Sequence, residues 1–161
     1  MTDPRLVLIG GANGAGKSTL ANVYIRDLMD AGLFLNADEV ARRIAPENQE
    51  RAAFAAGRSI VRARRELLDA RVSFAVESTL ASLSLLQIVI QANGAGYLTR
   101  LIFLFTATPQ INEFRVKQRV MQGGHNVDTD TIRRRHRLGL RHLPDYVSTG
   151  LRRGLWRGHR F

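Results

Sequence analysis

Short apolar segments alternate with longer segments of helical periodicity along this chain. The apolar segments predict buried β-strands, because each is a nearly continuous hydrophobic run that ends at glycine or at polar residues. The strands are expected at Arg5–Gly10, Leu33–Asn36, Val72–Glu77 and Leu98–Phe105, of which the last, LTRLIFLF, is the clearest.

The segments between these strands favour helices. Residues 47–70 are rich in Ala, Arg, Glu and Leu, which are strong helix formers. Proline is well suited to the first turn of a helix, so Pro109 is expected to open one. Helices are predicted at Lys17–Ala31, Glu47–Ala70 and Leu83–Asn93, from Pro109 onward, and in a segment that begins at Arg133–Arg135.

Buried strands that alternate with amphipathic helices indicate an α/β fold, in which helices cover both faces of a parallel sheet and form three layers with it. Because no repeat or linker divides the sequence, residues 1–161 are predicted to form a single domain. Ligands of such sheets bind beyond the carboxyl ends of the strands. The site is therefore expected at Gly11–Ser18, Asn36–Asp38, Glu77–Thr79 and the segment after Phe105.

The first predicted strand runs into a phosphate-binding motif. Gly11–Ser18, GANGAGKS, fits the P-loop (Walker A) pattern G-x-x-x-x-G-K-[ST] and joins a predicted strand to a predicted helix, as that motif requires. Glycines let backbone N–H groups point at phosphates, and the helix N-terminus favours their charge. Lys17, with a solvent-facing side chain, is expected to act in catalysis by contacting the β- and γ-phosphates, and Ser18 to ligate Mg²⁺. The predicted cofactors are ATP and Mg²⁺, and the predicted nucleotide-binding residues are Gly11, Ala12, Asn13, Gly14, Ala15, Gly16, Lys17, Ser18 and Thr19.

Two acidic residues follow predicted strands at the same edge of the sheet. Asp38 comes after the second strand and Glu77 closes the third. A carboxylate near the γ-phosphate can accept the proton of an attacking hydroxyl or hold the magnesium shell. Asp38 is therefore predicted to be catalytic, and Asp38, Glu77 and Thr79 to bind the acceptor. The structural alternatives are a helix N-cap for Asp38 and a turn cap for Thr79.

Arg115 and Arg119 share one face of a predicted helix, just ahead of Gly123-Gly124-His125. In small P-loop kinases such a segment is a lid whose arginines close over the phosphates and stabilise the charge of the transition state. We therefore predict a lid at about residues 115–135, with Arg115 and Arg119 as catalytic residues and Arg133–Arg135 as candidates to add to it. The alternative is a pair of solvent-exposed arginines before a flexible loop.

The formal net charge is +10, from 24 Lys and Arg against 14 Asp and Glu, and this favours anionic partners. Arginines concentrate at the C-terminal end, including a basic tail at about residues 151–161, so nucleic acid stays an alternative partner. Cysteine is absent, which excludes a thiolate zinc site and a cysteine nucleophile. No apolar segment is long enough to be a membrane span, so a cytoplasmic protein is expected.

The motifs GGANGAGKST, FLNADE, FAVESTL and RVKQRVMQGGHNV, the last followed by IRRRHR, occur in this order between about Arg5 and Tyr146. Together they resemble the zeta-toxin-like family of small P-loop kinases, within the wider group that contains chloramphenicol phosphotransferase and gluconate kinase. The first motif is shared by many nucleoside triphosphatases, whereas the four in this spacing are far more specific.

The resemblance implies an ATP-dependent kinase that phosphorylates UDP-N-acetylglucosamine, a UDP-amino sugar. An acid after the second strand would be the base and an acid after the third would bind substrate, which correspond by position to Asp38 and Glu77. The family's lysine matches Lys17, and its lid arginines match the region of Arg115 and Arg119. An antitoxin protein is a candidate partner.

The sequence departs from the family pattern in two places. The toxins carry an arginine shortly after the third-strand acid, where this chain has Ser78-Thr79-Leu80-Ala81. Similar proteins also usually continue into a final strand that helps to hold adenine, whereas Leu151–Phe161 is short, basic and unlike a buried strand.

Three functional hypotheses follow. The leading one is a phosphotransferase that moves the ATP γ-phosphoryl group to a hydroxyl of a small molecule. The second is a nucleic-acid-binding P-loop protein or polynucleotide kinase, and the third is a nucleotide-binding protein without transferase activity.

Overall fold

A five-stranded sheet organises the part of the chain that the computed structural model describes, namely residues 3–28, 33–36, 40, 49–150 and 152–155. The strands lie in the order β2-β3-β1-β4-β5, and each neighbouring pair is parallel. Their bounds are Arg5–Gly10 for β1, Leu33–Leu35 for β2, Phe74–Ser78 for β3, Leu98–Phe103 for β4 and Arg152–Leu155 for β5.

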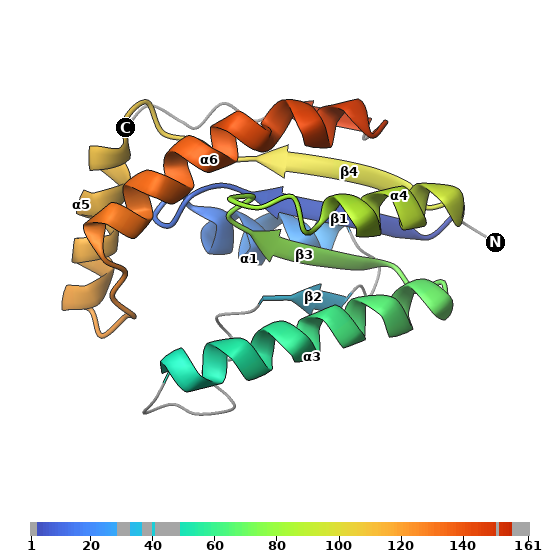
Figure 1. Cartoon of the computed structure of the whole chain (residues 1–161), viewed down its shortest axis with the longest axis horizontal. Helices are drawn as coiled ribbons and strands as arrows, with labels where there is room; N and C mark the ends of the chain where they lie inside the picture. Colours follow the sequence, from blue (N-terminus) through green and yellow to red (C-terminus); the bar gives the residue numbers. More distant parts are fainter. Residues whose placement is uncertain (1–2, 29–32, 37–39, 41–48, 151, 156–161) are drawn as a thin grey trace.

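Five helices connect the strands or follow them in the described residues. They are α1 at Lys17–Leu28, α3 at Gln49–Asp69, α4 at Leu86–Gly94, α5 at Pro109–Met121 and α6 at Thr129–Ser148. Figure 1 shows α3, α4 and α6 on one face of the sheet, α1 on the other, and α5 at the end to which the strand arrows point. The predicted three-layer α/β fold with a parallel sheet is therefore confirmed.

The central strand β1 is buried on both faces, and its side chains alternate between two cores. Leu6 and Leu8 pack with residues of α3, α4 and α6, whereas Val7 and Ile9 pack with Leu20 and other residues of α1 and the sheet. Burial of each such side chain contributes about 1.5–3 kcal/mol. This two-sided burial explains why β1 reads as a continuous apolar run, and it fixes the register that brings Glu77 beside Ile9.

The C-terminal segment corrects one prediction. Residues 152–155, which were not expected to be a strand, form β5 and pair with β4, so that Arg152 lies opposite Arg100 and Leu155 opposite Phe103. β5 has a neighbour on one side only in the described sheet, and edge strands tolerate charged and short sequences that a central strand does not. The continuous apolar run that identifies a central strand is therefore missing from the sequence RRGL.

The predicted lid region contains the end of α5, a connecting loop and the start of α6. The second of these helices begins at Thr129, four residues before the predicted start, because the Asp128 carboxylate accepts a hydrogen bond from the Thr131 backbone N–H at 2.8 Å and caps the helix. None of the helices in the described residues is long and apolar enough to cross a bilayer.

Candidate active site

The P-loop joins β1 to α1 as predicted, and its glycines adopt conformations that other residues rarely take. Gly11 has φ 146° and Gly14 has φ 77°. A Cβ atom at Gly11 would collide with the Leu104 carbonyl oxygen, and one at Gly14 would lie 2.6 Å from the Asn112 carbonyl oxygen. The loop can therefore keep this shape, with its backbone pressed against Leu104 just after β4 and against α5, only if these two positions are glycine.

Lys17 is the first residue of α1, and its side chain is buried rather than facing solvent as the sequence suggested. Its exposed fraction is 7%, and its Nζ donates a hydrogen bond to the Ala12 carbonyl at 3.0 Å. The same ammonium lies 3.7 Å from Oε1 of Glu77, whose side chain is 10% exposed. These two contacts hold the lysine side chain between the P-loop and the end of β3.

Glu77 is the centre of a polar cluster at the carboxyl end of β3. Besides its ion pair with Lys17, its Oε2 accepts hydrogen bonds from Ser18 Oγ at 3.3 Å and from Asn36 Nδ2 at 2.9 Å. The cluster therefore joins the P-loop to the ends of β2 and β3, as the parallel sheet predicts. Asp38, the predicted base, lies outside the described residues.

The donor set of this cluster suits Mg²⁺. Ser18 Oγ and the Glu77 carboxylate are hard oxygen donors beside the P-loop, and Mg²⁺ in nucleotide sites is held by one or two such groups together with phosphate oxygens and water. No group of three or more His, Asp or Glu side chains that could hold a metal occurs in the described part of the chain. A magnesium ion at Ser18 and Glu77 would thus be completed by nucleotide phosphates.

Arg135 approaches the P-loop from α6. Its Nη1 donates a hydrogen bond to Asn13 Oδ1 at 2.9 Å, while the buried Asn112 of α5 donates to the Asn13 carbonyl at 2.8 Å. Asn112 is itself held by the Thr106 hydroxyl, just after β4. Asn13 therefore connects the phosphate loop to both helices of the predicted lid region.

Two other arginines of the predicted lid region make contacts away from the P-loop. Arg119 is exposed and donates to the His125 carbonyl at 2.9 Å, and Arg133 pairs with Glu113 at 2.7 Å. Neither Arg115 nor Arg119 lines the cavity described below. The predicted catalytic roles of Arg115 and Arg119 therefore stay predictions, and the arginine that this structure brings to the P-loop is Arg135.

The sequence contains a signal that could have singled out Arg135 within its arginine run. Ile132 and Gly139 are buried on α6, and residues three or four positions from either share their face of the helix. Arg135 lies three positions after Ile132 and four before Gly139, whereas Arg133 and Arg134 lie off this face and are exposed.

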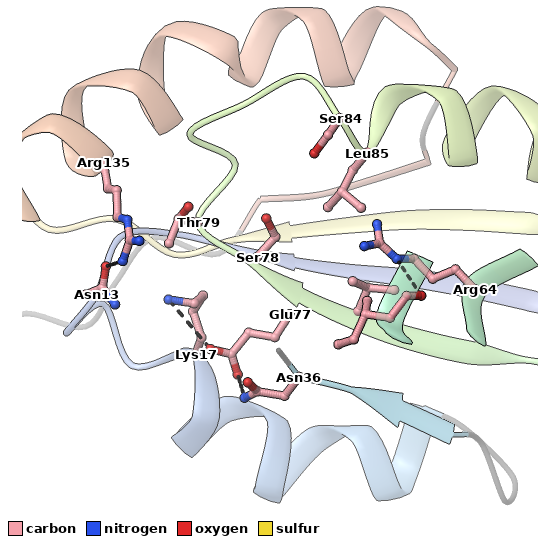
Figure 2. Close-up of a pocket in the computed structure, with 12 residues that line it drawn as sticks. Asn13, Lys17, Asn36, Arg64, Glu77, Ser78, Thr79, Ser84, Leu85 and Arg135 are labelled. Atoms are coloured by element: carbon pink, nitrogen blue, oxygen red, sulfur yellow. Dashed lines mark hydrogen bonds and ion pairs between the residues drawn. The ribbon is translucent and has the colours of Figure 1, made fainter. Parts of the chain in front are cut away.

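A cavity of about 230 Å³ opens beside the cluster, between the P-loop, the end of β3 and α3. Figure 2 shows Arg135 and Asn13 at one side, Lys17, Glu77 and Asn36 in the middle, and Arg64 at the other side. The remaining lining residues are Ile60, Val76, Ser78, Thr79, Ser84 and Leu85. Asn36 lies in a segment where the sequence placed the site, although no role was predicted for it, whereas Arg64 was not predicted to be a site residue.

Thr79 lines this cavity and also caps a turn, so both of its predicted roles are compatible. Its Oγ1 accepts a hydrogen bond from the Ala81 backbone N–H at 3.4 Å. The following segment is fixed by α6, since Tyr146 donates to the Ser82 carbonyl at 2.8 Å and His142 lies 3.1 Å from the Leu80 carbonyl. The Thr79 side of the cavity thus has a firmly held wall.

A parallel sheet with a P-loop after its first strand, and a polar cluster with a cavity at the strand ends, defines a P-loop protein of the small-kinase type. Residues 2–145 match the Zeta toxin family, and the chain belongs to that family. The resemblance predicted from the sequence motifs is therefore confirmed, and with it a kinase-like phosphotransferase class.

Three known proteins illustrate the relationship. An uncharacterized protein of Haemophilus influenzae strain KW20 / Rd is 31% identical over 126 residues, which cover 78% of this chain and 88% of the relative. A structure from the PezAT chromosomal toxin–antitoxin system of Streptococcus pneumoniae has a TM-score of 0.74 at 16% identity, covering 98% of this chain and 69% of that one. Shikimate kinase from Acinetobacter baumannii, solved in complex with shikimate, has a TM-score of 0.59 at 16% identity. The match covers 99% of this chain and 86% of the shikimate kinase chain. At these identities the two structures show the shared fold alone.

Proposed function

We propose that this protein transfers the γ-phosphoryl group of Mg²⁺-bound ATP to a hydroxyl group of a small molecule. The observation that carries the proposal is the joining of Lys17, Ser18 and Glu77 beside a cavity of about 230 Å³ that extends to α3. A P-loop that only binds nucleotide would not require a cavity that reaches from Lys17 as far as α3.

The residues divide into three roles in this mechanism. Lys17 and the P-loop backbone bind the β- and γ-phosphates, and Arg135 offsets charge that develops on the transferred group. Ser18 and Glu77 hold the magnesium ion, which neutralises phosphate charge when bound. The acceptor oxygen forms the new bond to phosphorus as the bond to the ADP oxygen breaks, and the hydroxyl proton passes to a carboxylate, which we propose is Asp38.

Glu77 suits a holding role better than that of a base. Its two oxygens already face Lys17, Ser18 and Asn36, so they are engaged by groups of the phosphate-binding cluster rather than directed at an acceptor hydroxyl alone. Thr79 at the cavity wall is proposed to bind the acceptor, and the lid arginines Arg115 and Arg119 are proposed to act on closure.

A screen of acceptors with γ-labelled ATP tests the function. UDP-N-acetylglucosamine, the acceptor that the family resemblance implies, heads the panel, and Lys17→Ala is the control for contaminating kinases. Transfer that depends on Lys17 supports the proposal, whereas ATP binding with transfer to no acceptor and only slow hydrolysis would favour nucleotide binding without transferase activity.

The basic surface supports a second candidate, a polynucleotide kinase or nucleic-acid-binding protein. Four arginines of α6 are exposed, namely Arg133, Arg134, Arg137 and Arg141. Phosphate-dominated binding weakens steeply with salt because counterions are released. An oligonucleotide complex that survives physiological salt, or labelling of a 5′-hydroxyl oligonucleotide, would favour this candidate over the small-molecule kinase.

We propose a cytoplasmic location and an antitoxin as protein partner. The support for a partner is similarity in fold to a chain of a toxin–antitoxin system, together with membership of the Zeta toxin family. Co-purification of the tagged chain with the product of a neighbouring gene, with loss of kinase activity in the complex, would test it.

A further inference from the structure

The cavity extends away from the P-loop to a second cationic group, Arg64 of α3. Figure 2 shows its guanidinium directed from the helix into the cavity, towards Leu85 and Ser78. Arg135 stands at the opposite side, and Lys17 lies between the two arginines, next to Glu77. The cavity therefore has positive groups at both sides, with Glu77 between them.

Arg64 is held in place without a carboxylate partner among the described residues. Its Nε donates a hydrogen bond to the Ile60 carbonyl at 3.2 Å, one turn earlier in the helix, and none of the ion pairs found in the described residues includes it. Burial lowers the pKa of the Arg64 guanidinium below its usual range, which reports that the charge is partly removed from water.

Neighbouring arginines of α3 show the contrast. Arg62 is exposed and pairs with Glu66 at 2.7 Å, the usual arrangement on a solvated helix face. Arg65 is exposed as well. A partly buried arginine that has no acidic partner among the described residues costs free energy, and an anionic ligand would supply a negative charge and accept from the planar guanidinium through two oxygens.

We propose that Arg64 binds an anionic group of the phosphate acceptor, so that the acceptor is a hydroxyl compound that also carries a carboxylate or a phosphate. The hydroxyl lies at the Glu77 side, near the γ-phosphate, and the anion lies at the α3 side. Ser78-Thr79-Leu80-Ala81, which follows β3, contains no cation, and Arg64 supplies one to the same cavity from another element. This inference rests on the proposed phosphotransferase function.

Paired acceptors test the inference. The pairs are gluconate with glucose, glycerol 3-phosphate with glycerol, and UDP-N-acetylglucosamine with N-acetylglucosamine, each assayed with γ-labelled ATP and Mg²⁺. We expect the anionic member of at least one pair to be used at least about 10-fold better in kcat/KM, as a charge-assisted hydrogen-bond pair predicts. The pair that responds shows whether the anion is a carboxylate or a phosphate.

Substitutions at Arg64 then assign the preference to this residue. Arg64→Gln should raise the KM of the anionic acceptor about 10–100-fold and leave the ATP KM and the use of the neutral member unchanged. Arg64→Lys keeps the stem and the charge and should restore part of the preference. Arg65→Gln, on the exposed side of the same helix, is the matched control and should behave as wild type.

Three results would overturn the inference. The first is an equal kcat/KM for the neutral and the anionic member of every pair. The second is a loss of kcat/KM in Arg64→Gln that is equal for both members of a pair. The third is that no anionic acceptor is phosphorylated at all. Transfer to neutral acceptors alone would leave the phosphotransferase function standing, whereas the absence of ATP binding and of any turnover would instead remove the proposed function.

Discussion

Lys17 and Glu77 meet at the carboxyl edge of the sheet, where the lysine Nζ lies 3.7 Å from the glutamate Oε1 and both side chains are largely buried. One residue belongs to the P-loop helix and the other to the neighbouring strand β3. Because a buried charge that loses its partner is costly, each residue supports the position of the other. A substitution of either residue is therefore expected to affect both the stability of the protein and its proposed phosphoryl transfer.

Lys17→Ala is expected to remove most ATP binding and turnover, since the residue is proposed to contact the β- and γ-phosphates. It should also lower the free energy of unfolding by about 1–3 kcal/mol, because the Glu77 carboxylate stays buried with one cation fewer. Calorimetric titration with ATP and Mg²⁺ measures the first effect, and thermal melting measures the second. Unchanged ATP binding in a folded variant would rule out the P-loop assignment.

The double variant Lys17→Ala/Glu77→Gln separates stability from function. The amide that replaces the Glu77 carboxylate has no negative charge to pair, so the melting temperature should recover part of the loss, by about 2–4 °C per kcal/mol for a chain of this size. ATP turnover should stay lost. A double variant that melts below Lys17→Ala would show that the ion pair does not account for the stability of this cluster.

Glu77→Gln alone is expected to weaken the binding of Mg²⁺ that supports turnover. The amide keeps an oxygen that can accept from Ser18 or Asn36 but removes the charge beside the proposed metal position. We expect the Mg²⁺ concentration for half-maximal turnover to rise about 10–100-fold, the range seen when groups that support a metal site are altered. Thr79→Ala, on the cavity wall, is the matched control and should change the acceptor KM without changing the Mg²⁺ requirement.

The sequence predicted the fold well because the central strands have a strong and local signal. β1 and β4 are apolar runs next to glycine or polar residues, and their observed positions agree with the predicted ones to within two residues. β5 was missed because an edge strand with two arginines lacks that signal. Local patterns identify buried strands, whereas edge strands depend on a neighbour that the local sequence does not reveal.

The site was predictable only where a motif or a strand end pointed to it. Gly11–Ser18 follows β1 directly and Glu77 lies at the end of β3, so topology alone places them at one edge. Arg64 lies in the middle of a helix rich in arginine, and only tertiary packing distinguishes it from Arg62 and Arg65. The burial of Lys17 likewise depends on the contact between the P-loop and β3, which no local pattern contains.

Arg135 is expected to act on the transition state more than on the binding of ATP. Its hydrogen bond to Asn13 places the guanidinium at the P-loop, where charge develops during transfer. Arg135→Ala should lower kcat by about 10²–10³-fold with little change in the ATP KM. Single-turnover and steady-state kinetics measure the two effects.

Arg134→Ala is the control for this prediction, because Arg134 is an exposed neighbour on the same helix and should be neutral. Arg115→Ala and Arg119→Ala belong in the same series, since both were predicted from the sequence to lie in a closing lid. A larger loss of kcat in either of these than in Arg135→Ala would return the transition-state role to α5 and contradict the assignment to Arg135.

The last prediction concerns Asp38, the proposed base. Asp38→Asn keeps the size and most of the capping ability of the side chain but cannot take a proton at neutral pH, so it separates catalysis from structure. Base catalysis contributes about 10²–10⁴-fold in rate, whereas the loss of a helix cap costs about 1 kcal/mol. We therefore expect the variant to bind ATP and to melt near the wild-type temperature while transfer falls by about two orders of magnitude or more. Near-normal transfer would leave Asp38 as a cap, and Glu77 would then be the better candidate for the base despite its contacts with Lys17 and Asn36.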